Sequence, residues 1–158
     1  MFDLTLSFDN GPTPDVTPVV LDVLARRGVK STFFVIGEKL GRPGHRALAE
    51  RAHAEGHWIG NHTWSHSLPF GLMAADAAKS EFDRTEAAIG PLRHRHRFFR
   101  PYGQGGNLDN RLLSTDVSRI SRANGRPSCC GARFRAIGRI RMAGSSVRSV
   151  RWLRNRGA

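Results

Sequence analysis

Two short stretches of the sequence carry side chains that could hold a metal ion and move a proton. The stretch NHTWSH places His62 and His66 four residues apart, and on a helical turn this spacing puts both imidazoles on one face. Asn10 or Asp9, in the stretch SFDNGP, could add an oxygen ligand and leave a position open for water. A metal ion lowers the pKa of a water molecule that it binds, and a nearby carboxylate can then accept the proton. The pattern is therefore typical of a metal site that activates a water molecule.

Each stretch also has a simpler interpretation. Histidines four residues apart often only pack against neighbours or face solvent. An acid, an amide, a glycine and a proline after a strand are also typical of a tight turn. The catalytic interpretation is favoured only if the fold brings the two stretches together.

The elements that must position these side chains alternate between strands and helices. Apolar runs, alternating or continuous, predict strands at residues 2–8, 31–37, 57–62 and 97–103. Helical spacing, with Thr17 as an N-cap and glycines as stops, predicts helices at residues 18–27, 44–56 and 74–90. This order implies the α/β class, with a parallel sheet and helical crossovers.

A parallel sheet gathers functional residues at the carboxyl ends of its strands. Asp9 and Asn10 follow the first predicted strand, residues 62–66 follow the third, and residues 100–102 (Arg-Pro-Tyr) lie at the end of the fourth. We therefore expect the three clusters at one edge of the sheet, where they can form a single site.

The stretches SFDNGP, HTWSH and FFRPYG resemble, in this order, the first three motifs of the NodB-like polysaccharide deacetylases, carbohydrate esterase family 4. The resemblance implies a distorted (β/α) barrel, of which residues 1–115 would form the N-terminal half. It also implies hydrolysis of N- or O-acetyl groups on an acetylated polysaccharide or oligosaccharide, such as a chitin- or peptidoglycan-like sugar. The implied cofactor is a divalent metal ion, zinc above all.

The resemblance assigns roles to residues of the first two motifs. Asp9 matches the catalytic base of the family, and Asn10 stands where the family has a metal-binding aspartate. His62 and His66 match its two histidine ligands. Because Asn10 offers a neutral carbonyl oxygen in place of a charged one, we expect it to weaken metal binding.

The third motif of the family has the form Arg-x-Pro-Tyr. Its arginine orients the base, and the backbone N–H of its tyrosine helps to hold the developing oxyanion. Arg100 and Tyr102 are the nearest matches in this sequence, with one residue fewer between arginine and proline. They are the remaining candidates for catalytic residues.

Other histidines and tryptophans have structural interpretations. We expect His45, His53 and His57, on or beside the second predicted helix, to lie at the surface. Trp58 is expected in the core. Trp64, inside the histidine motif, could equally pack in the core or stack on a sugar.

The positive charge of the chain is concentrated at one end. The formal net charge is +12, yet residues 1–115 hold 14 Lys and Arg against 12 Asp and Glu, whereas residues 116–158 hold 11 Arg and one acid. Residues 1–115 therefore look like an ordinary domain, to which an Arg-rich segment is joined. Nucleic acid is not the expected partner of the domain.

The Arg-rich segment does not continue the family pattern. Later strands of the family supply an Asp-Trp motif and a histidine general acid, whereas no histidine follows His96. Moving the codons of residues 128–144 back by one base permits a pattern that resembles the Asp-Trp motif. The sequence thus predicts a frameshifted, non-native tail and impaired activity. The alternative is a genuine disordered basic extension that binds nucleic acid or an acidic surface.

The sequence also predicts a compartment. No stretch resembles a membrane span, and residues 1–20 lack the layout of a signal peptide. Cys129 and Cys130 are adjacent, so they form neither an ordinary disulfide nor a metal-binding pair. We expect a cytoplasmic protein without a membrane partner.

Overall fold

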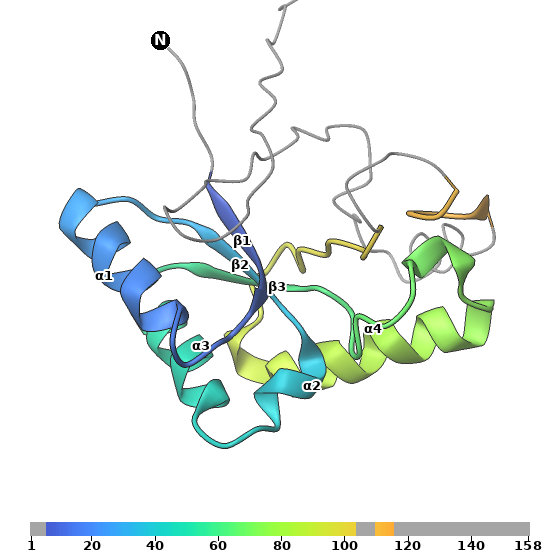
Figure 1. Cartoon of the computed structure of the whole chain (residues 1–158), viewed down its shortest axis with the longest axis horizontal. Coiled ribbons are helices and arrows are strands. Elements are labelled where there is room, and N and C mark those ends of the chain that lie inside the picture. Colours follow the sequence, from blue (N-terminus) through green and yellow to red (C-terminus); the bar gives the residue numbers. More distant parts are fainter. Residues whose placement is uncertain (1–5, 104–109, 116–158) are drawn as a thin grey trace, which may run out of the picture.

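A computed structural model describes residues 6–103 and 110–115 of the chain. Its centre is a parallel sheet in the order β1-β2-β3, formed by β1 (Ser7–Gly11), β2 (Thr32–Val35) and β3 (Trp58–Asn61). The helices are α1 (Thr17–Arg27), α2 (Gly37–Leu40), α3 (His45–Ala54) and α4 (Ala75–Ile89), with short 3-10 turns η1 (Phe70–Leu72) and η2 (Gly90–Leu92). In Figure 1 the helices lie on one side of the sheet. The predicted α/β class with parallel strands is confirmed.

The main hydrophobic core lies between the sheet and its helices. Phe33, Val35 and Ile59 of the strands pack with Leu21 and Leu24 of α1, and the cluster also includes Leu40, Ala49, Ala52, Ile89 and Leu92. Leu21 and Leu24 lie on one face of α1 because residues three apart are neighbours on a helix. Gly28 ends α1 in the left-handed conformation, with φ of 62°. Burial of this apolar face orients the strands whose ends carry the candidate site.

The first strand differs from its predicted limits. Residues 2–5 lie outside the described residues, and β1 runs through Asp9 and Asn10 to Gly11 rather than ending before them. Phe8 pairs with Phe33, and Gly11 pairs with Val35, so β1 has one residue more than β2 over this interval. Asp9 and Asn10 therefore lie in a β-bulge, which the alternation of apolar residues could not reveal.

The fourth predicted strand is also wrong. Residues 97–103 form only an isolated parallel bridge to β3, between Asn61 and Phe99. Arg97 closes a turn onto the carbonyl of His94 with a φ of 49°, which interrupts an extended chain. Pro101 lacks the N–H that would continue the ladder.

Two helical details were not predicted correctly. Thr17 is the first helical residue of α1 and Val16 is its N-cap. The hydroxyl of Thr17 instead accepts the N–H of Thr13 at 2.8 Å. The short helix α2 was not predicted, since residues 37–40 provide too few positions to show a helical period.

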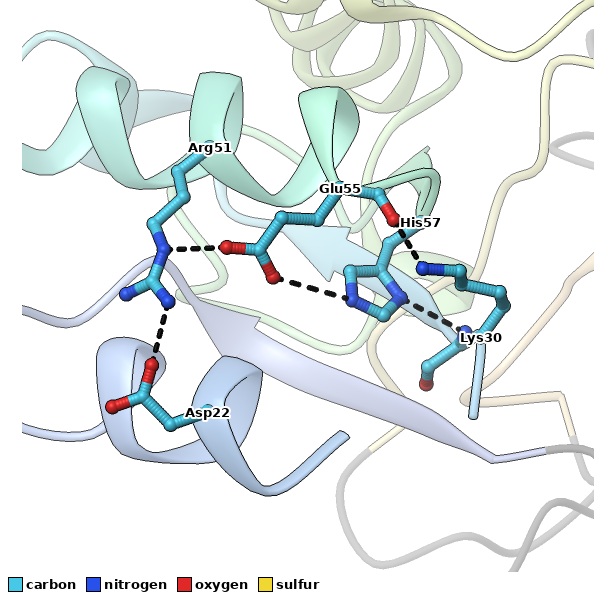
Figure 2. Close-up of polar contacts among 6 residues, drawn as sticks. Asp22, Lys30, Arg51, Glu55 and His57 are labelled. Atoms are coloured by element: carbon cyan, nitrogen blue, oxygen red, sulfur yellow. Dashed lines mark hydrogen bonds and ion pairs between the residues drawn. The ribbon is translucent and has the colours of Figure 1, made fainter. Parts of the chain in front are cut away.

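His57 is buried, which corrects its predicted place at the surface. Its Nδ1 accepts the N–H of Ser31 at 3.1 Å, and its Nε2 lies 3.9 Å from the Glu55 carboxylate. Figure 2 shows these contacts beside the ion pairs that Arg51 makes with Asp22 of α1 and with Glu55. The imidazole thus fastens the turn after α3 to the beginning of β2.

The remaining aromatic residues divide between surface and interior. Trp58, predicted in the core, is 47% exposed, because alternation along β3 directs Ile59 and not Trp58 into the helix-covered core. Its ring contacts those of His94 and Phe98, with centroid distances of 4.9 and 5.4 Å. His53 is exposed as expected.

His45 is half-buried rather than at the surface. Its Nδ1 lies 2.9 Å from the carbonyl oxygen of Pro12, and this contact ties the start of α3 to the segment that follows β1. Among the described residues, no helix has the length and apolar character that a membrane crossing requires. The Arg-rich segment at 116–158, with its proposed frameshift, lies outside the described residues.

Candidate active site

The β-bulge in β1 determines where Asp9 and Asn10 lie. Asn10 adopts a left-handed backbone conformation, with φ of 68°, which asparagine and aspartate tolerate better than most residues. Both residues are exposed at the carboxyl end of β1. Bulges redirect side chains and are common beside active sites. The residues predicted to form a turn therefore lie within the end of β1, where the side chains of Asp9 and Asn10 are exposed.

Arg100 joins the third sequence motif to the first. One nitrogen of its guanidinium, Nη1, lies 2.6 Å from Oδ1 of Asp9 and donates to the hydroxyl of Ser7 at 2.8 Å. Its guanidinium carbon lies 4.1 Å from the ring centroid of Phe34. The pair with Asp9 is only partly exposed, with 19% of the Arg100 side chain and 35% of the Asp9 side chain accessible. Arg100 is thus fixed from several sides although its motif is one residue short.

The two candidate histidines are neighbours, although no helix lies at residues 62–66. Thr63 and His66 have φ of 69° and 55°, so the segment is an irregular loop rather than the helical turn that we expected. The rings of His62 and His66 nevertheless lie 4.8 Å apart between centroids. The loop brings the imidazoles together by a different route from the predicted one.

The backbone fixes the tautomer of His62. Its Nδ1 lies 2.6 Å from the carbonyl oxygen of Arg100, and because a carbonyl only accepts, Nδ1 carries the hydrogen. Burial lowers the pKa of His62, against the opposing effect of the Asp9 charge. The neutral ring then presents an unprotonated Nε2. A metal-binding histidine usually donates its other ring N–H in this way.

His66 is also held in the neutral form. Burial is the main cause that lowers its pKa to about 4, and the neighbouring His62 and Lys39 act in the same direction. Its ring stacks on that of Tyr102, with centroids 3.8 Å apart. The carbonyl oxygen of Tyr102 accepts the N–H of Phe70 at 2.7 Å, which fixes the backbone at this position.

Glu81 of α4, which sequence reasoning missed, holds the histidine loop. Its Oε2 accepts the N–H groups of Trp64 and Ser65, each at 2.8 Å, and its Oε1 accepts the Ser65 hydroxyl at 2.9 Å. Hydrogen bonds to a charged acceptor are among the stronger ones in proteins. The sequence contains one hint only, an acid on the helix that follows the histidine motif.

A second side chain of α4, Glu86, acts through the end of β3. It is buried, and its carboxylate accepts a hydrogen bond from Nδ2 of Asn61 at 3.1 Å. The same carboxylate forms ion pairs with Arg93 and Arg97. The Oδ1 of Asn61 in turn accepts the N–H of Thr63 at 2.9 Å. The first residues of the histidine loop are therefore anchored to α4 as well.

The side chain of Trp64 is half-buried and contacts residues of α2 and α4. The Arg84 guanidinium lies 4.1 Å from its ring centroid, and on the other side the ring approaches Gly37. A Cβ on Gly37 would lie 2.6 Å from Cε3 of Trp64, so this contact needs glycine. Trp64 therefore packs against its own chain, and stacking on a sugar stays a prediction.

The residues present fit a metal ion only in part. Within residues 6–103 and 110–115, no three His, Cys, Asp or Glu side chains form a group that could hold a metal ion. Two neutral imidazoles are nevertheless adjacent, and one of them has its second ring nitrogen bonded to a carbonyl as metal sites require. The third predicted ligand, Asn10, is an amide, which is a weaker ligand than a carboxylate. Two imidazoles and an amide oxygen, if they share one ion, would hold a divalent cation only weakly.

The chain is similar in sequence to proteins of one family. Residues 3–116 match the family model described as polysaccharide deacetylase. A peptidoglycan-N-acetylglucosamine deacetylase of Bacillus cereus is 36% identical over 112 residues, which are 70% of this chain and 39% of that protein. A chitooligosaccharide deacetylase of Rhizobium leguminosarum bv. trifolii is 42% identical over 89 residues, 55% of this chain and 39% of that protein.

The fold agrees as well. A family 4 acetyl xylan esterase of Clostridium thermocellum, solved in complex with a cobalt ion, superposes with a TM-score of 0.61 and 32% identity, over 74% of this chain and 53% of that one. The chain thus spans about half of this solved structure and less than half of the two curated relatives. The matched residues include all three motifs of the candidate site. The chain belongs to the polysaccharide deacetylase family.

Proposed function

We propose that the site removes acetyl groups from an acetylated polysaccharide by hydrolysis, with a divalent metal ion held by His62, His66 and Asn10. The single observation that carries the proposal is the position of Arg100. Its guanidinium contacts the carboxylate of Asp9, and its carbonyl oxygen accepts from His62. One residue therefore connects the proposed base to the proposed metal ligands.

Each residue has a distinct part in this reaction. Asp9 accepts a proton from the attacking water, and Arg100 keeps the Asp9 carboxylate in one orientation. The backbone N–H of Tyr102 is the proposed donor to the oxyanion of the tetrahedral intermediate. A divalent metal ion, when bound, supplies Lewis acidity that polarises the acetyl carbonyl and acidifies water. We expect low activity, because the neutral Asn10 weakens the site.

The names of the relatives support the choice of substrates. Two of them are described as deacetylases of peptidoglycan N-acetylglucosamine and of chitooligosaccharide, and a third as an acetyl xylan esterase. The test is acetate release from chitooligosaccharide, peptidoglycan and acetyl xylan, with Zn²⁺, Co²⁺ or a chelator. Slow, metal-dependent release that is lost in Asp9→Ala and kept in Asp76→Ala supports the proposal. Asp76 is an exposed acid at the start of α4. No release from any substrate with either metal would contradict the proposal.

A further inference from the structure

Lys39 lies at the edge of the candidate site. It belongs to α2, which begins directly after the carboxyl end of β2, and its Nζ donates to the backbone carbonyl oxygen of Asn10 at 2.7 Å. The side chain is half-buried. The ammonium group is thus fixed against the residue that stands in the place of the family's metal-binding aspartate.

The positive charge of Lys39 has no acidic partner among the described residues. The nearest acid in sequence, Glu38, pairs with Arg42 at 2.8 Å. The carboxylate of Asp9 pairs with Arg100 at 2.6 Å. None of the ion pairs in residues 6–103 and 110–115 involves Lys39, whose recorded bond is to a neutral carbonyl. Lys39 thus places beside Asn10 a positive charge that no ion pair among these residues neutralises.

The charge lies beside a proposed metal ligand. Asn10 is the third proposed ligand, and the Lys39 ammonium group is bonded to its backbone at 2.7 Å. A divalent cation held by Asn10 would be repelled by this ammonium group, and in a partly buried site the repulsion is screened less than in water. The effect of Lys39 therefore adds to that of the neutral Asn10.

We propose that Lys39 is a built-in cation of this site, which lowers the site's affinity for divalent metal ions. The inference rests on the proposed function, because it assumes that His62, His66 and Asn10 are the metal ligands. Asn10 removes a negative charge from the site, and Lys39 adds a positive one. Together the two residues lower the affinity, so that the site needs a higher concentration of the metal ion to be occupied.

The test is Co²⁺ and Zn²⁺ binding to the full chain by calorimetry, with the visible absorption of Co²⁺ as a second readout. The variants are Lys39→Met, Lys39→Arg and, as a matched control, Lys79→Met. Lys79 is an exposed lysine of α4 that pairs with Asp83, so its loss changes the net charge equally. We expect Lys39→Met to lower Kd roughly tenfold, and Lys39→Arg and Lys79→Met to leave it within about twofold. The gain should shrink at high ionic strength.

The possible results separate the two proposals. An unchanged Kd in Lys39→Met, in protein that keeps its circular dichroism spectrum, overturns the role of Lys39 and leaves the metal site intact if Asn10→Asp binds tightly. Equal gains in Lys39→Met and Lys79→Met also overturn it, because they would reflect net charge alone. If Asn10→Asp and Lys39→Met both fail to bind either metal, the proposed metal site is itself wrong.

Discussion

The guanidinium of Arg100 lies 2.6 Å from the carboxylate of Asp9, 91 residues away in the sequence. The same arginine offers its carbonyl oxygen to Nδ1 of His62. Three sequence motifs on separate segments therefore meet at one residue, at the carboxyl ends of β1 and β3. This meeting is the reason to regard Asp9 as part of a catalytic site rather than of a turn.

Replacing Arg100 by methionine removes the partner that holds Asp9. We expect acetate release to fall roughly tenfold to a hundredfold, because a misplaced base loses much of its contribution. The binding of Co²⁺ should change little, since the Arg100 carbonyl that bonds His62 belongs to the backbone. Acetate release and calorimetry on the same preparation measure both effects. Unchanged release would show that Arg100 does not position the base.

Replacing Asn10 by aspartate restores a negative ligand. The residue has a φ of 68°, and aspartate adopts this conformation as readily as asparagine does, so the bulge should persist. We expect the affinity for Zn²⁺ or Co²⁺ to rise at least tenfold, as added ligand charge favours a divalent cation. Calorimetric titration measures the change. Equal affinities of the two proteins would mean that residue 10 is not a ligand.

Glu81→Gln tests the anchoring of the histidine loop to α4. The carboxylate accepts from the N–H groups of Trp64 and Ser65, and a neutral amide oxygen would accept them more weakly. We expect a loss of about 1–3 kcal/mol in the free energy of unfolding and faster hydrogen exchange at residues 64 and 65. Glu50→Gln, at an exposed position of α3 paired with Arg46, is the control. If residues 64 and 65 exchange at the same rate in both variants, Glu81 does not anchor the histidine loop.

Because His57 is buried, we expect the free energy of unfolding to depend on pH. Burial is the main cause that lowers its pKa in the folded protein, and Lys30 adds to the effect. The unfolded chain therefore takes up the proton first, so stability is constant above the unfolded pKa near 6.5 and falls as the pH drops below it. Because His62 and His66 act in the same direction, the measurement compares two proteins.

Urea unfolding at pH 7.5 and pH 5 provides the comparison. In His57→Gln, whose amide oxygen can still accept the N–H of Ser31, the loss of stability between the two pH values should be smaller than in the unchanged protein. An identical loss in both proteins would mean that His57 is not protonated on unfolding in this range.

The sequence predicted the layers of the fold well, for physical reasons. Leu21 and Leu24 show the helical period of α1, and Gly28 its end, while the continuous apolar run at 32–35 marks a buried strand. Local patterns of this kind suffice to order strands and helices along the chain. They also place the first two motifs near strand ends, whereas the strand predicted before the third motif forms only an isolated bridge.

The details of the site could not be predicted in the same way. The bulge at Asn10 depends on how β1 pairs with β2, and the burial of His57 depends on the N–H of Ser31 in another segment. Glu81 acts only because α4 turns one face toward the histidine loop. Such contacts join residues distant in sequence, and no local period reports them.

The most direct measurement of the central claim compares acetate release by Asn10→Asp with release by the double variant Asn10→Asp/Asp9→Asn. Both proteins keep the strengthened metal ligand, so a difference between them reports on the base alone. With saturating Zn²⁺ or Co²⁺ and chitooligosaccharide as substrate, we predict that removal of the Asp9 carboxylate lowers the rate by roughly a hundredfold or more. Equal rates in the two variants would contradict the role of Asp9 as the general base.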